Sequence, residues 1–93
     1  MDHFSRYWKS LRPHPTRAQV LLELHGDATS LANALGALAR FGVVPKEVKV
    51  LHEGESEVVL LHLASCDMRD TVLKLIEAGF TRVKGLNPVA VVG

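Results

Sequence analysis

Side chains that could ligate a metal ion lie near the ends of the predicted strands of this 93-residue sequence. His25 and His52 end two strands that flank a third, about 10 Å apart at the usual strand spacing. Carboxylates stand near them in the sequence, at Asp27, Glu53, Glu55 and Glu57. Imidazole and carboxylate groups together can ligate a divalent cation. Because no His-x-His or Cys-x-x-Cys spacing accompanies them, we expect exposed strand-end histidines, with no metal site and no cofactor.

Two further side chains have reactive potential. His62 interrupts an apolar strand, where an imidazole can titrate near neutral pH at a subunit contact; a hydrogen-bonded core or interface histidine is the plainer interpretation. Cys66, the single cysteine, precedes a predicted helix whose N-terminus can lower a thiol pKa, but Asp67 opposes that effect, so a structural role is expected. The sequence has no Ser-His-Asp or Cys-His arrangement and no glycine-rich phosphate loop. We therefore expect no enzyme and no catalytic residue.

Composition predicts one small domain that is soluble and cytoplasmic. The chain is 47% hydrophobic, and its net charge of +1 comes from 11 basic and 10 acidic residues spread along it. Nucleic acid is not an expected partner, because neutralising phosphates takes a concentrated basic surface. With no apolar run near about 18 residues and no signal peptide, no membrane partner is expected either. Domains of this size often gain stability by pairing with a second copy.

Residues 1–16 differ from the rest and are predicted to be an N-terminal arm. An apolar stripe at helical spacing favours one short helix, ended by Pro13 and Pro15. The stripe consists of Phe4, Tyr7, Trp8 and Leu11. We expect this arm to pack on its own domain or on a sister subunit. Contact between its aromatic and basic residues and a nucleic acid is the less favoured alternative.

Residues 17–93 alternate between strand and helix patterns. The patterns predict strands over 18–25, 46–52 and 58–64, helices over 31–40 and 68–78, and a last strand that starts near 80, is interrupted around 85–88 and finishes over 89–92. Helix caps are expected at Asp27, Thr29 or Ser30 and at Asp67.

This order predicts an α+β, ferredoxin-like βαββαβ sandwich: a four-stranded antiparallel sheet, first and third strands central, with both helices on one face. The other face would be apolar and bare, which usually marks an interaction surface. Self-association is its simplest use, and the N-terminal arm is an alternative cover.

The segment from Val20 to Val83 resembles the ACT domain, the small amino-acid-sensing module of regulated biosynthetic enzymes. The resemblance rests on the strand Val20-Leu21-Leu22-Glu23-Leu24, the turn and helix from Gly26 to Leu38, Phe41-Gly42-Val43-Val44, and the stretch from Val72 to Phe80. It implies an effector bound by Gly26, Asp27, Ala28, Thr29, Ser30 and Leu31, together with Val43, often at a subunit interface.

Backbone N–H groups at the helix start suit a carboxylate, and Asp27 suits an α-ammonium. The sequence departs from the family in lacking Pro-Gly near Thr29-Ser30 and in having Val43 where an Asn is common.

Two functions are therefore expected from the sequence. The first is a stand-alone ACT-like regulatory module, a homodimer that binds a small-molecule effector such as an amino acid. The alternative is a ligand-free interaction or regulatory subunit that docks on a larger enzyme through the arm or through the sheet face around Leu60.

Overall fold

Residues 2–26, 29–64 and 67–89 are described by the computed structural model. Along them lie the helices α1 (His3–Ser10), α2 (Leu31–Arg40) and α3 (Met68–Glu77) and the strands β1 (Ala18–Leu24), β2 (Glu47–His52), β3 (Glu57–Leu63) and β4 (Val83–Leu86). The four strands form one antiparallel sheet in the order β2-β3-β1-β4. The predicted α+β class and four-stranded antiparallel sheet are thus confirmed. No helix within these ranges combines the length and apolar character needed to cross a membrane.

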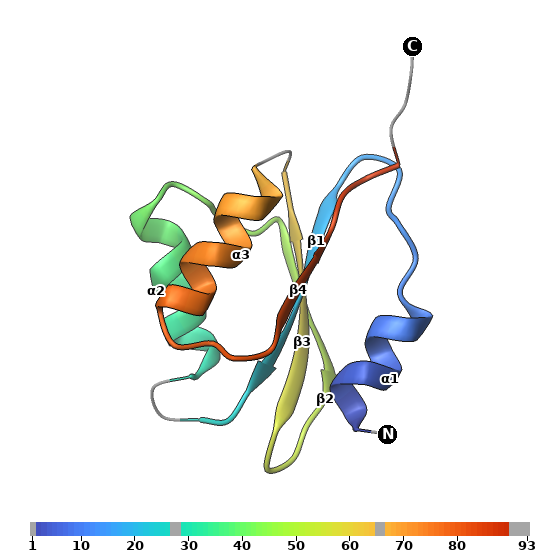
Figure 1. Cartoon of the computed structure of the whole chain (residues 1–93), viewed down its shortest axis with the longest axis vertical. Coiled ribbons are helices and arrows are strands. Elements are labelled where there is room, and N and C mark those ends of the chain that lie inside the picture. Colours follow the sequence, from blue (N-terminus) through green and yellow to red (C-terminus); the bar gives the residue numbers. More distant parts are fainter. Residues whose placement is uncertain (1, 27–28, 65–66, 90–93) are drawn as a thin grey trace.

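Helices cover both faces of the sheet. Figure 1 shows α2 and α3 packed on one face and α1 on the other. The face expected to be bare is therefore covered by the N-terminal arm of the same chain, the alternative that the aromatic stripe suggested. Phe4 is 2% exposed and packs in a cluster with Leu21, Val58 and Leu60. The Tyr7 hydroxyl fastens the helix further by donating to the carbonyl oxygen of Leu51, at 2.7 Å.

Side chains of β1 alternate between the two faces of the sheet, so this strand contributes to two hydrophobic cores. Val20, Leu22 and Leu24 face α2 and α3, whereas Leu21 faces α1. All seven residues of β1 are buried, because helices lie on both sides of the sheet. The larger core on the α2–α3 side also contains Ala34, Leu38, Val59, Leu61, Leu63, Leu75 and Phe80.

Local capping sets the helix ends. Ser30 accepts a hydrogen bond from the Asn33 amide at 3.2 Å, and Asp67 accepts one from the Asp70 amide at 3.0 Å. Both caps were among those predicted. Asp2 caps α1 in the same way, accepting from the Ser5 amide at 2.8 Å. Each side chain satisfies an amide that would otherwise lack a partner at the helix N-terminus.

Two predicted details of the second βαβ unit are wrong. The expected apolar face of α3 included Ile76, which is 49% exposed, while Thr71 is buried. At 100° per residue, position 76 is rotated about 80° from Met68, so it leaves the buried stripe. The expected interruption at Gly85 is instead part of β4, and Phe80 lies before the strand. A side chain at Gly85 would collide with Met68, so the glycine allows α3 to approach β4 closely. Of the final segment predicted over 89–92, Val89 is not in a strand, and residues 90–92 lie outside the described residues.

Candidate functional site

The turn before α2 uses its described polar groups to hold itself together. Gly26 has φ +79°, a conformation that favours glycine, and its carbonyl oxygen accepts from the Thr29 amide at 3.0 Å. The Thr29 hydroxyl accepts from the His25 amide and donates to the Gly26 carbonyl oxygen, both at 3.2 Å. Ser30 caps α2. These bonds account for Thr29 and Ser30 without a ligand; Asp27 and Ala28 lie outside the described residues.

Val43 lies at the opposite end of α2 from this turn. A helix of 10 residues separates them, or about 15 Å at 1.5 Å per residue. Within one chain the structure therefore does not bring Val43 together with Gly26 or residues 29–31. Val43 instead lines an apolar hollow of about 250 Å³ between α2 and β2. Its other lining residues are Leu35, Ala39, Val44, Pro45 and Val48.

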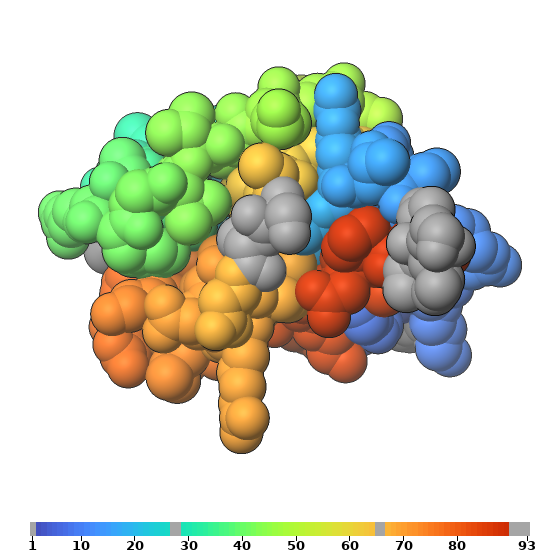
Figure 2. Space-filling view, turned by 90° about the horizontal axis from the view of Figure 1, so that it is seen from above, coloured from blue at the N-terminus to red at the C-terminus, as the bar shows by residue number. Residues whose placement is uncertain are grey.

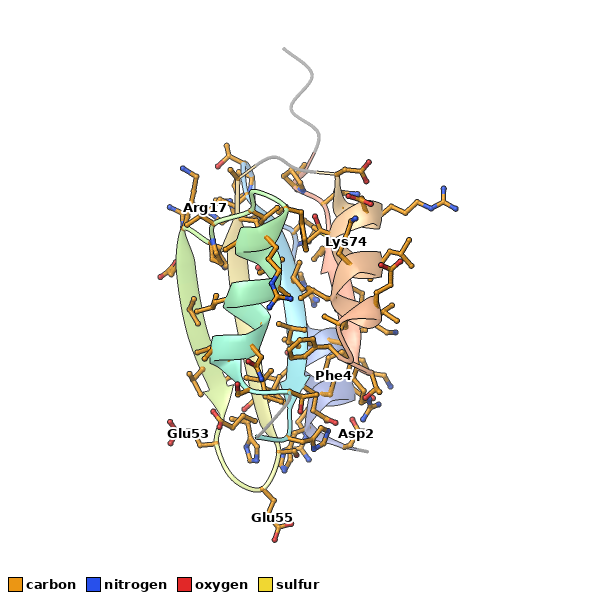
Figure 3. All side chains as sticks on the ribbon, turned by 90° about the vertical axis from the view of Figure 1, so that its left-hand side faces the viewer. Asp2, Phe4, Arg17, Glu53, Glu55 and Lys74 are labelled. Carbon is orange, nitrogen blue, oxygen red and sulfur yellow. The ribbon has the colours of Figure 1, made fainter. Side chains whose placement is uncertain are left out.

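This hollow lies along a free edge of the sheet. Seen from above, the segment at 41–50 forms the green rim of the molecule (Figure 2). Figure 3 shows α2 lying over the sheet beside its outermost strand, β2, with α3 on the far side. Val44, Val48 and Val50 are 74%, 37% and 46% exposed. The sequence signal for this surface was the alternation of charged and apolar residues in β2, which predicts an edge strand but not what lies beside it.

The two strand-end histidines have separate partners. His25 Nε2 lies 2.8 Å from Glu23 Oε1. The His52 ring stacks on His3 of α1, with ring centroids 3.6 Å apart. Within the described ranges, no group of three or more His, Cys, Asp or Glu side chains is arranged to hold a metal ion. Both histidines therefore contribute contacts to the face that α1 covers.

His62 is a buried histidine of β3 that lies opposite Gln19, near the start of β1. It is 6% exposed, and its Nδ1 lies 3.5 Å from Arg17 Nη1 and 3.7 Å from Glu47 Oε1. Burial, reinforced by the positive charge of Lys49, holds the pKa of His62 below its ordinary value, although Glu47 opposes the shift. His14 packs edge-on against its ring. This cluster joins the end of the N-terminal arm to the sheet, in keeping with the interpretation of His62 as a hydrogen-bonded core histidine.

A second polar network joins α1 to the start of β4. Arg82 lies 2.7 Å from Asp2 and 3.6 Å from Glu23, and it donates to the Ser5 hydroxyl at 3.3 Å. Its guanidinium also lies over the Phe4 ring, 4.9 Å from the centroid. The Ser5 amide and Arg82 together lower the pKa of Asp2 to about 2. Sequence reasoning missed this network, since Arg82 is about 80 residues from α1.

A cavity of about 300 Å³ opens beside this network, between α1 and residues 81–84. Its wall includes Ser5, Trp8 and Lys9 from α1 and Thr81, Arg82 and Lys84 from the opposite side. Lys84 Nζ lies 5.3 Å from the centroid of the Trp8 ring. The basic and aromatic residues of the arm were noted in the sequence, but nothing there paired them with Lys84.

Cys66 lies outside the described residues. Comparison of the chain with protein-family models, with curated proteins and with solved structures finds no match.

Proposed function

We propose that this chain is a ferredoxin-like, ACT-like regulatory module that works as a homodimer and binds a small metabolite, such as an amino acid, where two copies meet. The strand order β2-β3-β1-β4, with α2 and α3 on one face, supports that fold. The observation that carries the dimer is the exposed apolar edge at β2, since exposed patches of this kind usually mark interaction sites.

The occupant of this edge that fits best is a second copy of β2, running antiparallel. Opposite residues of an antiparallel pair share a face of the sheet. A two-fold axis at Val48 sets Val48 against its copy, on the side of α2. On the side of α1 the same axis places Glu47 of each copy opposite Lys49 of the other, which gives two oppositely charged pairs.

Charge favours this register over its neighbour. An axis at Lys49 would set two lysines directly opposite each other, which is destabilising. Lysines on an edge strand ordinarily discourage pairing. Here the axis at Val48 places Lys49 of each copy opposite Glu47 of the other, so this lysine favours one register. The β-bulge after Val50 confines regular pairing to the first part of β2, the part that this register uses.

This dimer supports an effector site built from two chains. Because the two-fold axis reverses one copy, the turn at 26–31 of one chain lies at the same end as the segment at 43–45 of the other. The residues that the ACT resemblance implies, Gly26 to Leu31 and Val43, are far apart in one chain but would face each other across the interface. The apolar hollow beside Val43 supplies room for a side chain.

Sedimentation velocity tests the dimer. Val48→Asp sets two carboxylates at the axis and should give monomers, whereas Leu73→Asp on α3, also at an exposed apolar position, should leave the dimer intact. Lys49→Glu and Glu47→Lys should each fail to self-associate, because each sets like charges opposite one another. Mixed together, these two variants should form a heterodimer, since every opposed pair is then complementary. A wild-type monomer at about 100 µM would contradict the proposal.

Thermal melting with each of the twenty amino acids tests the effector. A ligand at ten times its Kd stabilises the folded state by about 1.4 kcal/mol, which raises Tm by about 5 to 10 °C for a domain of this size. The rise should be lost in Val48→Asp. A dimer whose Tm responds to no amino acid at millimolar concentration would leave the interaction subunit as the better function.

A further inference from the structure

We propose that the cavity between α1 and residues 81–84 binds a small organic anion, with its carboxylate or phosphate group held by Lys9 and Lys84 and its apolar part against Trp8. The cavity of about 300 Å³ is at the small end of the range for ligand sites. It lies within one chain, on the α1 side of the sheet, so it is independent of the proposed dimer interface.

The charges around this cavity favour an anion. Three cations line it, Lys9, Arg82 and Lys84, and no acidic side chain does. Arg82 is already matched, because Asp2 lies 2.7 Å and Glu23 3.6 Å from it. Lys9 and Lys84 have no ion pair with any residue that the structure describes. Two lysines without an ion pair therefore line one cavity, Lys9 from α1 and Lys84 from β4.

The wall between these two lysines is held in place before any ligand arrives. Arg82 donates to Ser5, lies over the Phe4 ring, and accepts from the Glu23 amide through its backbone carbonyl, at 3.1 Å. Phe4 itself is buried under α1. Because these groups are already ordered, binding immobilises few side chains, and less free energy is lost on ordering the site.

Trp8 gives the cavity a flat apolar wall. Its ring is half-buried, with Lys84 Nζ 5.3 Å from the centroid. A planar or aliphatic group fits against such an indole while its acidic group meets the ammonium beside it. Single-stranded nucleic acid also uses aromatic and basic residues. The net charge of +1 and the cavity volume of about 300 Å³ favour a small molecule over a polyanion.

Trp8 is the only tryptophan of the chain, so its fluorescence reports this site directly. Phenyl phosphate is the probe, with benzyl alcohol as the uncharged comparison and inorganic phosphate as the anion without a ring. We expect saturable quenching by phenyl phosphate with a Kd at or below about 1 mM, and weaker binding of the other two. Lys84→Gln and Lys9→Gln should each raise the Kd about tenfold, through loss of a charge-assisted hydrogen bond. The control Lys74→Gln, on α3, should leave it unchanged.

Three results would overturn the proposal. One is a Trp8 signal that none of the probes changes. Another is a Kd for Lys84→Gln and Lys9→Gln equal to that of Lys74→Gln. The third is tighter binding of a ten-residue oligothymidylate than of phenyl phosphate, which would make the surface a nucleic-acid site. A Kd that is the same in wild type and in Val48→Asp would support a site within one chain, whatever the outcome for the dimer.

Discussion

Replacing Phe4 with alanine tests whether α1 is an integral part of the fold. Phe4 is 2% exposed and is the buried side chain of α1, packed on Leu21, Val58 and Leu60. Substitutions of buried Phe by Ala cost about 3–5 kcal/mol. A helix at the edge of a small cluster can shift to fill part of the space, so we expect the low end, about 3 kcal/mol. This is a large fraction of the stability of about 5–14 kcal/mol typical for 93 residues.

Urea unfolding followed by two probes measures this loss. Circular dichroism reports the whole fold, whereas Trp8 fluorescence reports the docking of α1. The two transitions should coincide in wild type. In Phe4→Ala the Trp8 transition should come at lower urea, because α1 has lost its main anchor to the sheet. The control Arg6→Ala, on the exposed side of α1, should change stability by less than about 0.5 kcal/mol. A loss below about 1 kcal/mol in Phe4→Ala would show that α1 is not an integral part of the fold.

Three further predictions concern charge and close packing. The pKa of Asp2 is lowered from 3.8 to about 2, so its contribution to stability should be present above pH 4 and lost as pH falls toward 2; Asp2→Asn should abolish this part of the pH dependence of the urea midpoint. The pKa of His62 is lowered below 6.5, so its contribution to stability is present above that pH and is lost as pH falls below it. His62→Gln should therefore flatten the dependence of the urea midpoint on pH between pH 7 and 5. Gly85→Ala should lower the free energy of unfolding by about 1–3 kcal/mol, because the new Cβ meets Met68. Gly36→Ala, in an open position of α2, should raise it by about 0.5–1 kcal/mol. Equal effects of the two substitutions would contradict the close contact between Gly85 and α3.

Much of the fold could be predicted because its signals are local. Alternation along β1 and β3 follows from the two-residue period of a strand, and the Ser30 and Asp67 caps follow from hydroxyl and carboxylate groups placed before apolar helical runs. The stripe on the N-terminal arm predicted α1 for the same reason. Gly85 was misjudged because its environment depends on how closely α3 approaches β4, a distance that no local pattern encodes. Ile76 was misjudged for a local reason, its rotation away from the buried stripe of the helix.

The polar groups were harder to predict than the helices. His25 and His52 were expected together at one edge of the sheet, yet each has its own partner, Glu23 and His3. Glu23 lies two residues before His25 on β1, whereas His3 comes from α1, whose position against the sheet the pattern of strands did not give. The cavity beside Trp8 escaped prediction for the same reason.

The order of helices and strands, the caps at Ser30 and Asp67 and the edge position of β2 followed from the sequence, because these depend on neighbours within a few residues. The tertiary structure was needed to show that α1 covers the second face of the sheet, that Arg82 is matched by Asp2, and that an apolar hollow lies beside β2. Those outcomes depend on contacts between residues up to about 80 positions apart. Such contacts form only when the burial of apolar surface along the whole chain brings these distant residues together.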